Sequence, residues 1–184
     1  MFLKLTLPLL LALTTSAQPT TSPTTTTPLP TLQPGWSFIR AVEPPAYHSY
    51  LQTIPSATPA PAYLSSNTHA GQFNIISGQL VYNTNTGAAG TGQLYMNVEN
   101  PVDKAQRTLQ TWFNTTQNQY GTFGFQGDAV TLSVGDIARP NVAAWYVCGD
   151  EGALFINTGP YGYLTPEGCF DEMIHSYGGS TPTV

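Results

Sequence analysis

Short apolar and aromatic runs alternate with turn residues along the whole stretch from Gly35 to Val184. This alternation is typical of half-buried strands, and helical spacing of apolar residues is scarce. The chain also carries 17 glycines and 16 prolines, whereas only 8% of its residues are charged. We therefore predict an all-β, single compact domain of about a dozen short strands, arranged as a β-trefoil, a sandwich or a barrel.

The strands are expected where β-forming residues lie between turn signals. The predicted strands are Trp36 to Val42, His48 to Thr53, Ala62 to Ser65, Gln72 to Ile76, Gln79 to Tyr82, Gln93 to Val98, Arg107 to Phe113, Gly121 to Phe125, Ala129 to Val134, Ala143 to Cys148 and Ala153 to Asn157. Ser77-Gly78 and Gln126-Gly127-Asp128 each separate two apolar runs, which predicts two tight hairpins.

The sequence leaves the local structure of two segments undecided. Asn100-Pro101 could begin a helix over Val102 to Gln110, but the apolar spacing there favours a loop followed by a strand. The segment from Asp171 to Tyr177 could form one helical turn or a closing strand.

The N-terminal 34 residues have a different composition from the rest of the chain. Residues 1–17 have the form of a signal peptide, with Lys4 before a leucine-rich stretch and Thr15-Ser16-Ala17 at the cleavage site. The apolar stretch is shorter than the ~20 residues that a spanning helix needs. Residues 18–34 form a Thr/Pro-rich disordered linker suited to O-glycosylation. The all-β domain is therefore expected over residues 35–184, secreted and without a membrane anchor after signal cleavage.

Cys148 and Cys169 are the two cysteines of a chain expected to enter an oxidising compartment. Only one pairing is possible, so we predict a disulfide worth roughly 3 kcal/mol by loop-entropy reasoning. The formal charge of −5 and the pI near 4.8 lack the basic surface that phosphate binding requires, so nucleic acid is not an expected partner.

The titratable residues predict neither a catalytic site nor a metal or other cofactor. His48, His69 and His175 match no zinc or metalloprotease spacing. Glu172 and His175 would share a face only in a helix, and even with Asp171 they would not complete a metal site. Asp150-Glu151 is explained by a charged hairpin tip.

The densest polar and aromatic cluster surrounds Tyr161 and Tyr163. In an extended segment both rings would point to one side and could form a platform for the apolar face of a sugar. The alternative is that the rings pack against the disulfide loop. Asn114 begins the N-glycosylation sequon Asn-Thr-Thr.

Several short pieces of the domain resemble small secreted fungal cell-wall proteins of the PhiA-like type. These pieces are Phe38 to Val42, Ala70 to Phe73, Gly78 to Val81, Trp145 to Cys148 and Gly168-Cys169. The resemblance spans most of the domain and implies a wall or extracellular setting, with no catalytic signature to carry over.

The predicted function is that of a noncatalytic secreted protein of the cell wall, binding wall polysaccharide or glycoprotein glycans. Abundant Tyr and Asn, low charge and a glycosylated stalk favour this function. The alternatives are a secreted glycan-active hydrolase, or a protease inhibitor or effector, because a compact disulfide-bonded β domain also suits them.

Overall fold

The structure is a computed structural model that describes residues 27–84 and 93–184. These residues form fourteen strands and one short 3-10 turn, with no α-helix in the two described ranges. The predicted signal peptide and residues 18–26 of the predicted linker lie outside them. The strands are β1 (Phe38–Ala41), β2 (Tyr50–Gln52), β3 (Ala60–Pro61), β4 (Tyr63–Ser65), β5 (Phe73–Ile76), β6 (Gln79–Tyr82), β7 (Leu94–Val98), β8 (Thr108–Asn114), β9 (Thr122–Gln126), β10 (Ala129–Ser133), β11 (Trp145–Cys148), β12 (Ala153–Asn157), β13 (Cys169–Glu172) and β14 (Ile174–Tyr177).

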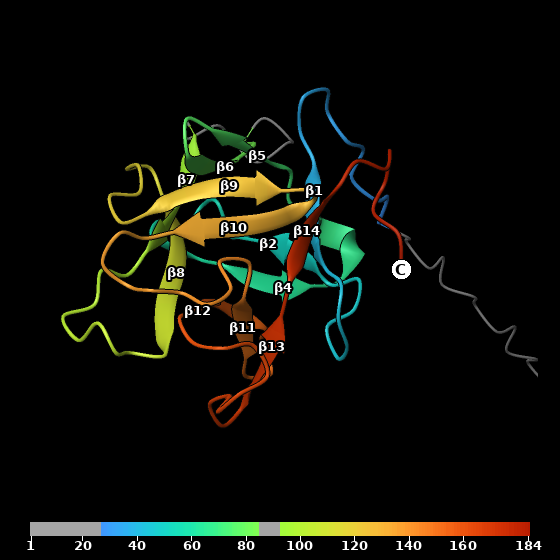
Figure 1. Cartoon of the computed structure of the whole chain (residues 1–184). Coiled ribbons are helices and arrows are strands. Elements are labelled where there is room, and N and C mark those ends of the chain that lie inside the picture. The colour runs from blue at the N-terminus through green and yellow to red at the C-terminus, as the bar shows by residue number, and fades with distance from the viewer. Residues whose placement is uncertain (1–26, 85–92) are drawn as a thin grey trace, which may run out of the picture.

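The strands pair antiparallel along one path, β5-β6-β7-β8-β12-β4-β2-β1-β14-β10-β9. β11 lies beside β12 and β13, and β3 pairs with β8. The two ends of the path meet where the amide of Phe123 in β9 donates to the carbonyl of Gly78 (2.9 Å). The result is a nearly closed, barrel-like single domain, with β9 beside the β5–β6 hairpin (Figure 1). The all-β prediction is confirmed, and the barrel is the one of the three expected architectures that the domain resembles.

Inward-facing apolar side chains from most strands form one continuous core. Phe73, Tyr82 and Phe113 form an aromatic cluster in it, with ring centroids 5.4 to 6.2 Å apart. Trp145 is fully buried, and its indole nitrogen donates to the carbonyl of Val130 (3.1 Å). Closing the sheet on this core removes most free strand edges from solvent.

All eleven predicted strands overlap an observed one, and both predicted hairpins are present. Residues 101–107 form a loop before β8, so the loop-then-strand interpretation is confirmed. The undecided segment from Asp171 to Tyr177 is extended and contains the end of β13 and all of β14. β3 was not predicted, because it is two residues long, follows Pro59 and itself contains Pro61.

The two ends of the described chain lie against the domain on the same side (Figure 1). The amide of Leu32, within the predicted linker, donates to the carbonyl of Ser180 (2.9 Å). The Tyr50 hydroxyl donates to the carbonyl of Thr183 (2.9 Å) and accepts from its amide (2.8 Å). Residues near the predicted linker boundary therefore make contacts with the domain. Within the described residues, no helix is long and apolar enough to cross a membrane.

Candidate functional site

Along the strand β8, buried side chains alternate with side chains that face outward. Leu109, Thr111 and Phe113 are buried, whereas Gln110 and Trp112 between them are exposed and half-buried. Successive side chains of a strand point to opposite faces, so the two outward residues lie on the same side of the sheet. The outward face of β8 therefore presents an amide followed by an indole ring.

Neighbouring strands add residues of the same two kinds to this face. Directly paired residues of antiparallel strands share a face. Gln110 is paired with Phe155 of β12, Trp112 with Asn97 of β7, and Asn114 with Tyr95 of β7. We call this surface the aromatic–amide face. It consists of Tyr95, Asn97, Gln110, Trp112, Asn114 and Phe155.

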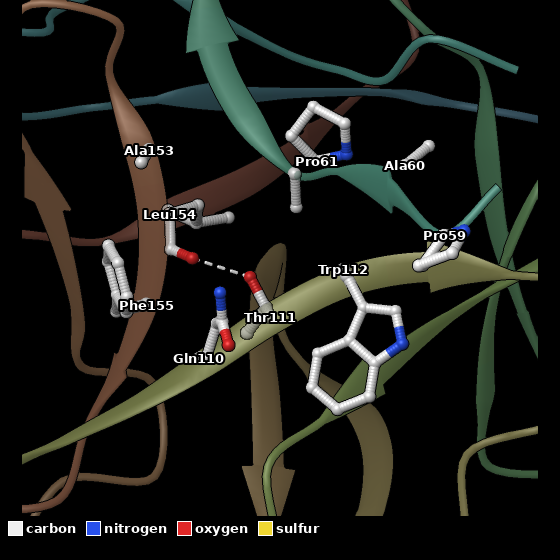
Figure 2. Close-up of a pocket in the computed structure, with 10 residues that line it drawn as sticks. Pro59, Ala60, Pro61, Gln110, Thr111, Trp112, Ala153, Leu154 and Phe155 are labelled. Carbon is white, nitrogen blue, oxygen red and sulfur yellow. Dashed lines mark hydrogen bonds between the residues drawn. The ribbon is translucent and has the colours of Figure 1, made fainter. Parts of the chain in front are cut away.

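A pocket of about 510 Å³ opens beside this face, where β8 changes its pairing partner. β8 pairs with β12 through Asn157 to Phe155 and then with β3 through Pro61 and Ala60. At this change of partner the Thr111 hydroxyl donates to the carbonyl of Leu154 (2.5 Å), as the dashed line in Figure 2 shows. The lining residues are Pro59, Ala60, Pro61, Ala62, Gln110, Thr111, Trp112, Ala153, Leu154 and Phe155.

The pocket combines flat apolar surfaces with unused hydrogen-bonding groups. Figure 2 shows the rings of Phe155 and Trp112 on either side of Gln110. Neither the Gln110 carboxamide nor the Trp112 indole N–H bonds to any described residue. None of the ten lining side chains is ionisable. Such a site can pack against apolar C–H surface and exchange hydrogen bonds with hydroxyl groups, and its volume lies in the usual range for ligand pockets.

Tyr161 and Tyr163 lie on an exposed turn, with 38% and 60% of their surfaces accessible. Gly162 between them has a φ of 70°, a left-handed conformation suited to glycine, so the expected extended segment is absent. The two tyrosines therefore do not share a face by strand alternation. Burial raises the pKa of the Tyr161 hydroxyl, and the nearby carboxylates of Glu172, Glu43 and Asp171 raise this pKa further.

Arg107 holds this turn against the barrel. One guanidinium nitrogen donates both to the hydroxyl of buried Tyr146 (2.7 Å) and to the carbonyl of Tyr163 (2.9 Å). Gly159 allows the close approach, since a Cβ there would lie 2.2 Å from the Arg107 Cζ. The position of the turn thus depends on a side chain 56 residues away along the chain.

The predicted disulfide between Cys148 and Cys169 is confirmed. It joins a directly paired position of β11 and β13. The chain that it encloses contains the turn with Tyr161, Gly162 and Tyr163, which we call the tyrosine turn. The disulfide therefore limits how far this turn can move from the barrel.

The charged candidates occupy structural positions. Asp150 and Glu151 lie exposed at the turn between β11 and β12, as expected for a hairpin tip. Glu172 is fully buried at the end of β13, and His175 lies on β14, so they do not share a helical face. Over residues 27–84 and 93–184, no three His, Cys, Asp or Glu side chains converge as a metal site would require.

Asn114, the first residue of the predicted sequon, ends β8 and belongs to the aromatic–amide face. Its Oδ1 accepts hydrogen bonds from the amide (2.8 Å) and the hydroxyl (3.4 Å) of Thr115. Thr115 and Thr116 are exposed. The sequon is therefore on the surface at the edge of the face.

The sequence pattern predicted a site at Tyr161 and Tyr163 and did not indicate the aromatic–amide face. The polar–aromatic alternation in Gln110, Trp112 and Asn114 was the available signal, but the partners on β7 and β12 come from distant segments. No protein-family model, curated protein or solved structure matches this chain. The structure itself therefore describes the kind of protein, which is a disulfide-bonded, barrel-like β domain with an uncharged aromatic pocket on its outer surface.

Proposed function

We propose that this chain is a noncatalytic, secreted, cell-wall-associated protein that binds neutral glycans through the aromatic–amide face. The observation that carries the proposal is the pocket beside Trp112, where free amide and indole groups adjoin ring and proline surfaces. Pyranose sugars have the matching chemistry, because their axial C–H groups form an apolar face and their hydroxyls lie around the edge.

The absence of charge in the pocket lining supports a neutral ligand over an acidic or basic one. A charged ligand would lose hydration on entry and would find no countercharge among the ten lining side chains. The amide groups can both donate to and accept from sugar hydroxyls. Neutral wall polysaccharide or glycoprotein glycans therefore fit this lining better than an anionic polymer.

The predicted signal peptide and the disulfide support a location outside the cell. Residues 1–17 have the sequence of a signal peptide, and a disulfide is compatible with an oxidising compartment. The resemblance to PhiA-like wall proteins supports the cell wall as the destination.

Retention on insoluble chitin, β-glucan and mannan tests the proposal, with all variants produced without N-linked sugar so that Trp112 is uncovered. Trp112→Ala should weaken retention about three- to tenfold, because it removes one stacking ring. Gln110→Ala should also weaken retention, and this exposed position makes unfolding a poor explanation of the loss. Phe125→Ala is the matched control, since Phe125 is an exposed aromatic residue on β9, outside the face.

Three results would contradict the proposal. Equal retention of the wild type and both face variants would place glycan binding elsewhere. Release of reducing sugar would favour a glycan-active hydrolase. A wild-type protein that is retained on none of the three polysaccharides and that binds a protease tightly would favour an inhibitor or effector.

A further inference from the structure

Asn114 lies between two aromatic rings of the aromatic–amide face. Tyr95 is its direct cross-strand partner, and Trp112 precedes it by two residues on the same face of β8. Directly opposed Cβ atoms are about 5 Å apart, and residues two apart on a strand are separated by roughly 6.8 Å. A group attached to the Asn114 side chain therefore begins within reach of both rings.

The reactive atom of the sequon is free. Asn114 Oδ1 accepts from Thr115, but Asn114 Nδ2 donates to no described residue. The hydroxyl of Tyr95 donates to Gln93 Oε1 (2.9 Å). The indole N–H of Trp112 has no partner in the described part of the chain. The site thus offers an attachment atom, two neighbouring aromatic residues and an unused donor.

We propose that Asn114 carries an N-linked glycan whose first N-acetylhexosamine packs on Trp112, so that the chain's own sugar occupies the β7 side of the aromatic–amide face. In the attachment step, Asn114 Nδ2 attacks the anomeric carbon of a polyprenyl-diphosphate-linked oligosaccharide. The N–C bond forms, the bond from carbon to diphosphate oxygen breaks, and Nδ2 loses a proton while the diphosphate leaves with the electron pair. The inference rests on the secretory part of the proposed function.

The chemistry of the neighbourhood favours packing over a glycan that projects freely into solvent. The Trp112 indole is half-buried and presents apolar surface that a sugar ring can cover. The sugar can also accept a hydrogen bond from the indole N–H. An external glycan would then have access mainly to the Gln110 and Phe155 side of the pocket.

Thermal unfolding and NMR of the secreted protein test the packing. The glycosylated protein, before and after enzymatic trimming to one sugar, is compared with Thr116→Ala, which destroys the sequon. Thr116→Ser, which retains the sequon, is the matched control. We expect Tm to be higher by a few degrees in both glycosylated forms than in Thr116→Ala, and NMR cross-peaks between sugar protons and the Trp112 indole.

The same Tm difference is then measured in the Trp112→Leu background, which keeps apolar bulk and removes the flat ring. The inference predicts that the glycan no longer raises Tm there. A folded, secreted protein without sugar on Asn114 would overturn it, as would an equal Tm gain in the Trp112→Leu background or the absence of cross-peaks. Loss of polysaccharide retention with these cross-peaks intact would count against the proposed function alone.

Discussion

At the scale of single residues, Arg139 is a half-buried cation whose side chain bonds, within the described part of the chain, only to backbone carbonyls. Its guanidinium donates to the carbonyls of Leu132 (2.5 Å), Ala144 (2.7 Å), Asn157 (3.0 Å) and Val142 (3.1 Å). These four carbonyls belong to β10, β12 and the connection between β10 and β11. The Arg139 side chain therefore joins these segments, in which the carbonyls of Val142 and Ala144 also accept from the amides of Leu132 (3.0 Å) and Asn157 (3.2 Å).

Arg139→Ala should lower the free energy of unfolding by on the order of 4 kcal/mol, because it removes four charged hydrogen bonds that join these segments. Urea unfolding measures the change. Arg40→Ala is the control, since the half-exposed Arg40 lies over the Tyr177 ring (4.0 Å) and should cost about 1 kcal/mol or less. Equal losses in the two variants would contradict the structural role of Arg139.

Glu172 makes stability depend on pH. Its Oε1 accepts from the amides of Val42 (3.1 Å), Glu43 (3.0 Å) and Met173 (2.9 Å), whereas Oε2 has no partner among the described residues. Burial raises the pKa of this carboxyl above its usual value of 4.5, and the charge of Glu43 raises it further. These effects outweigh the three amides, which favour the ionised form.

The folded state therefore holds the Glu172 proton at pH values where the unfolded chain has lost it. Its contribution to the free energy of unfolding should fall as pH rises from about 4.5 through the raised pKa. Glu172→Gln, which keeps an oxygen acceptor and cannot ionise, should flatten this fall in urea unfolding measured from about pH 4 to about pH 7. The same pH slope in both proteins would rule out Glu172 as its source.

At the scale of elements, local alternation predicted strands well and surfaces poorly. β6 and β12 have the predicted bounds because β-forming residues lie between clear turn signals. The aromatic–amide face could not be predicted in this way. It depends on the pairing of Trp112 with β7 and of Gln110 with β12, and such pairings join segments far apart in the chain. The Tyr161–Tyr163 prediction found exposed rings but assumed an extended segment where Gly162 makes a turn.

The tyrosine turn gives a prediction at this scale. If it adds to glycan retention, the double variant Tyr161→Ala/Tyr163→Ala should bind about three- to tenfold more weakly, with a smaller effect than the combined loss of Trp112 and Gln110. Its fold should persist, because Arg107 bonds to the backbone carbonyl of Tyr163 and not to the ring. Retention on polysaccharide, with thermal unfolding alongside, measures both quantities. Unchanged retention in the folded variant would remove the turn from the binding surface.

At the scale of the whole molecule, the sheet closes into a barrel-like domain and both ends of the described chain dock against it. The contact between β9 and the β5–β6 hairpin closes the sheet, and the bonds of Leu32 and Thr183 fasten both ends to the domain. A binding surface built on paired strands loses little conformational freedom when a ligand binds. The aromatic–amide face is built on such paired strands, which suits recognition of a repeating, neutral glycan.

The most direct test of glycan binding at the aromatic–amide face is an NMR titration with soluble oligomers of chitin, β-glucan and mannan. The titrated protein is the folded Thr116→Ala variant, which has no sugar on Asn114 and leaves Trp112 uncovered. We expect one oligomer to shift the resonances of the Trp112 indole N–H and the Gln110 side-chain amide, together with those of backbone amides in β8 and β12. Resonances of Phe125 on β9 should stay in place. Shifts confined to other parts of the barrel, or no shifts with any of the three oligomers, would rule out glycan binding at the aromatic–amide face.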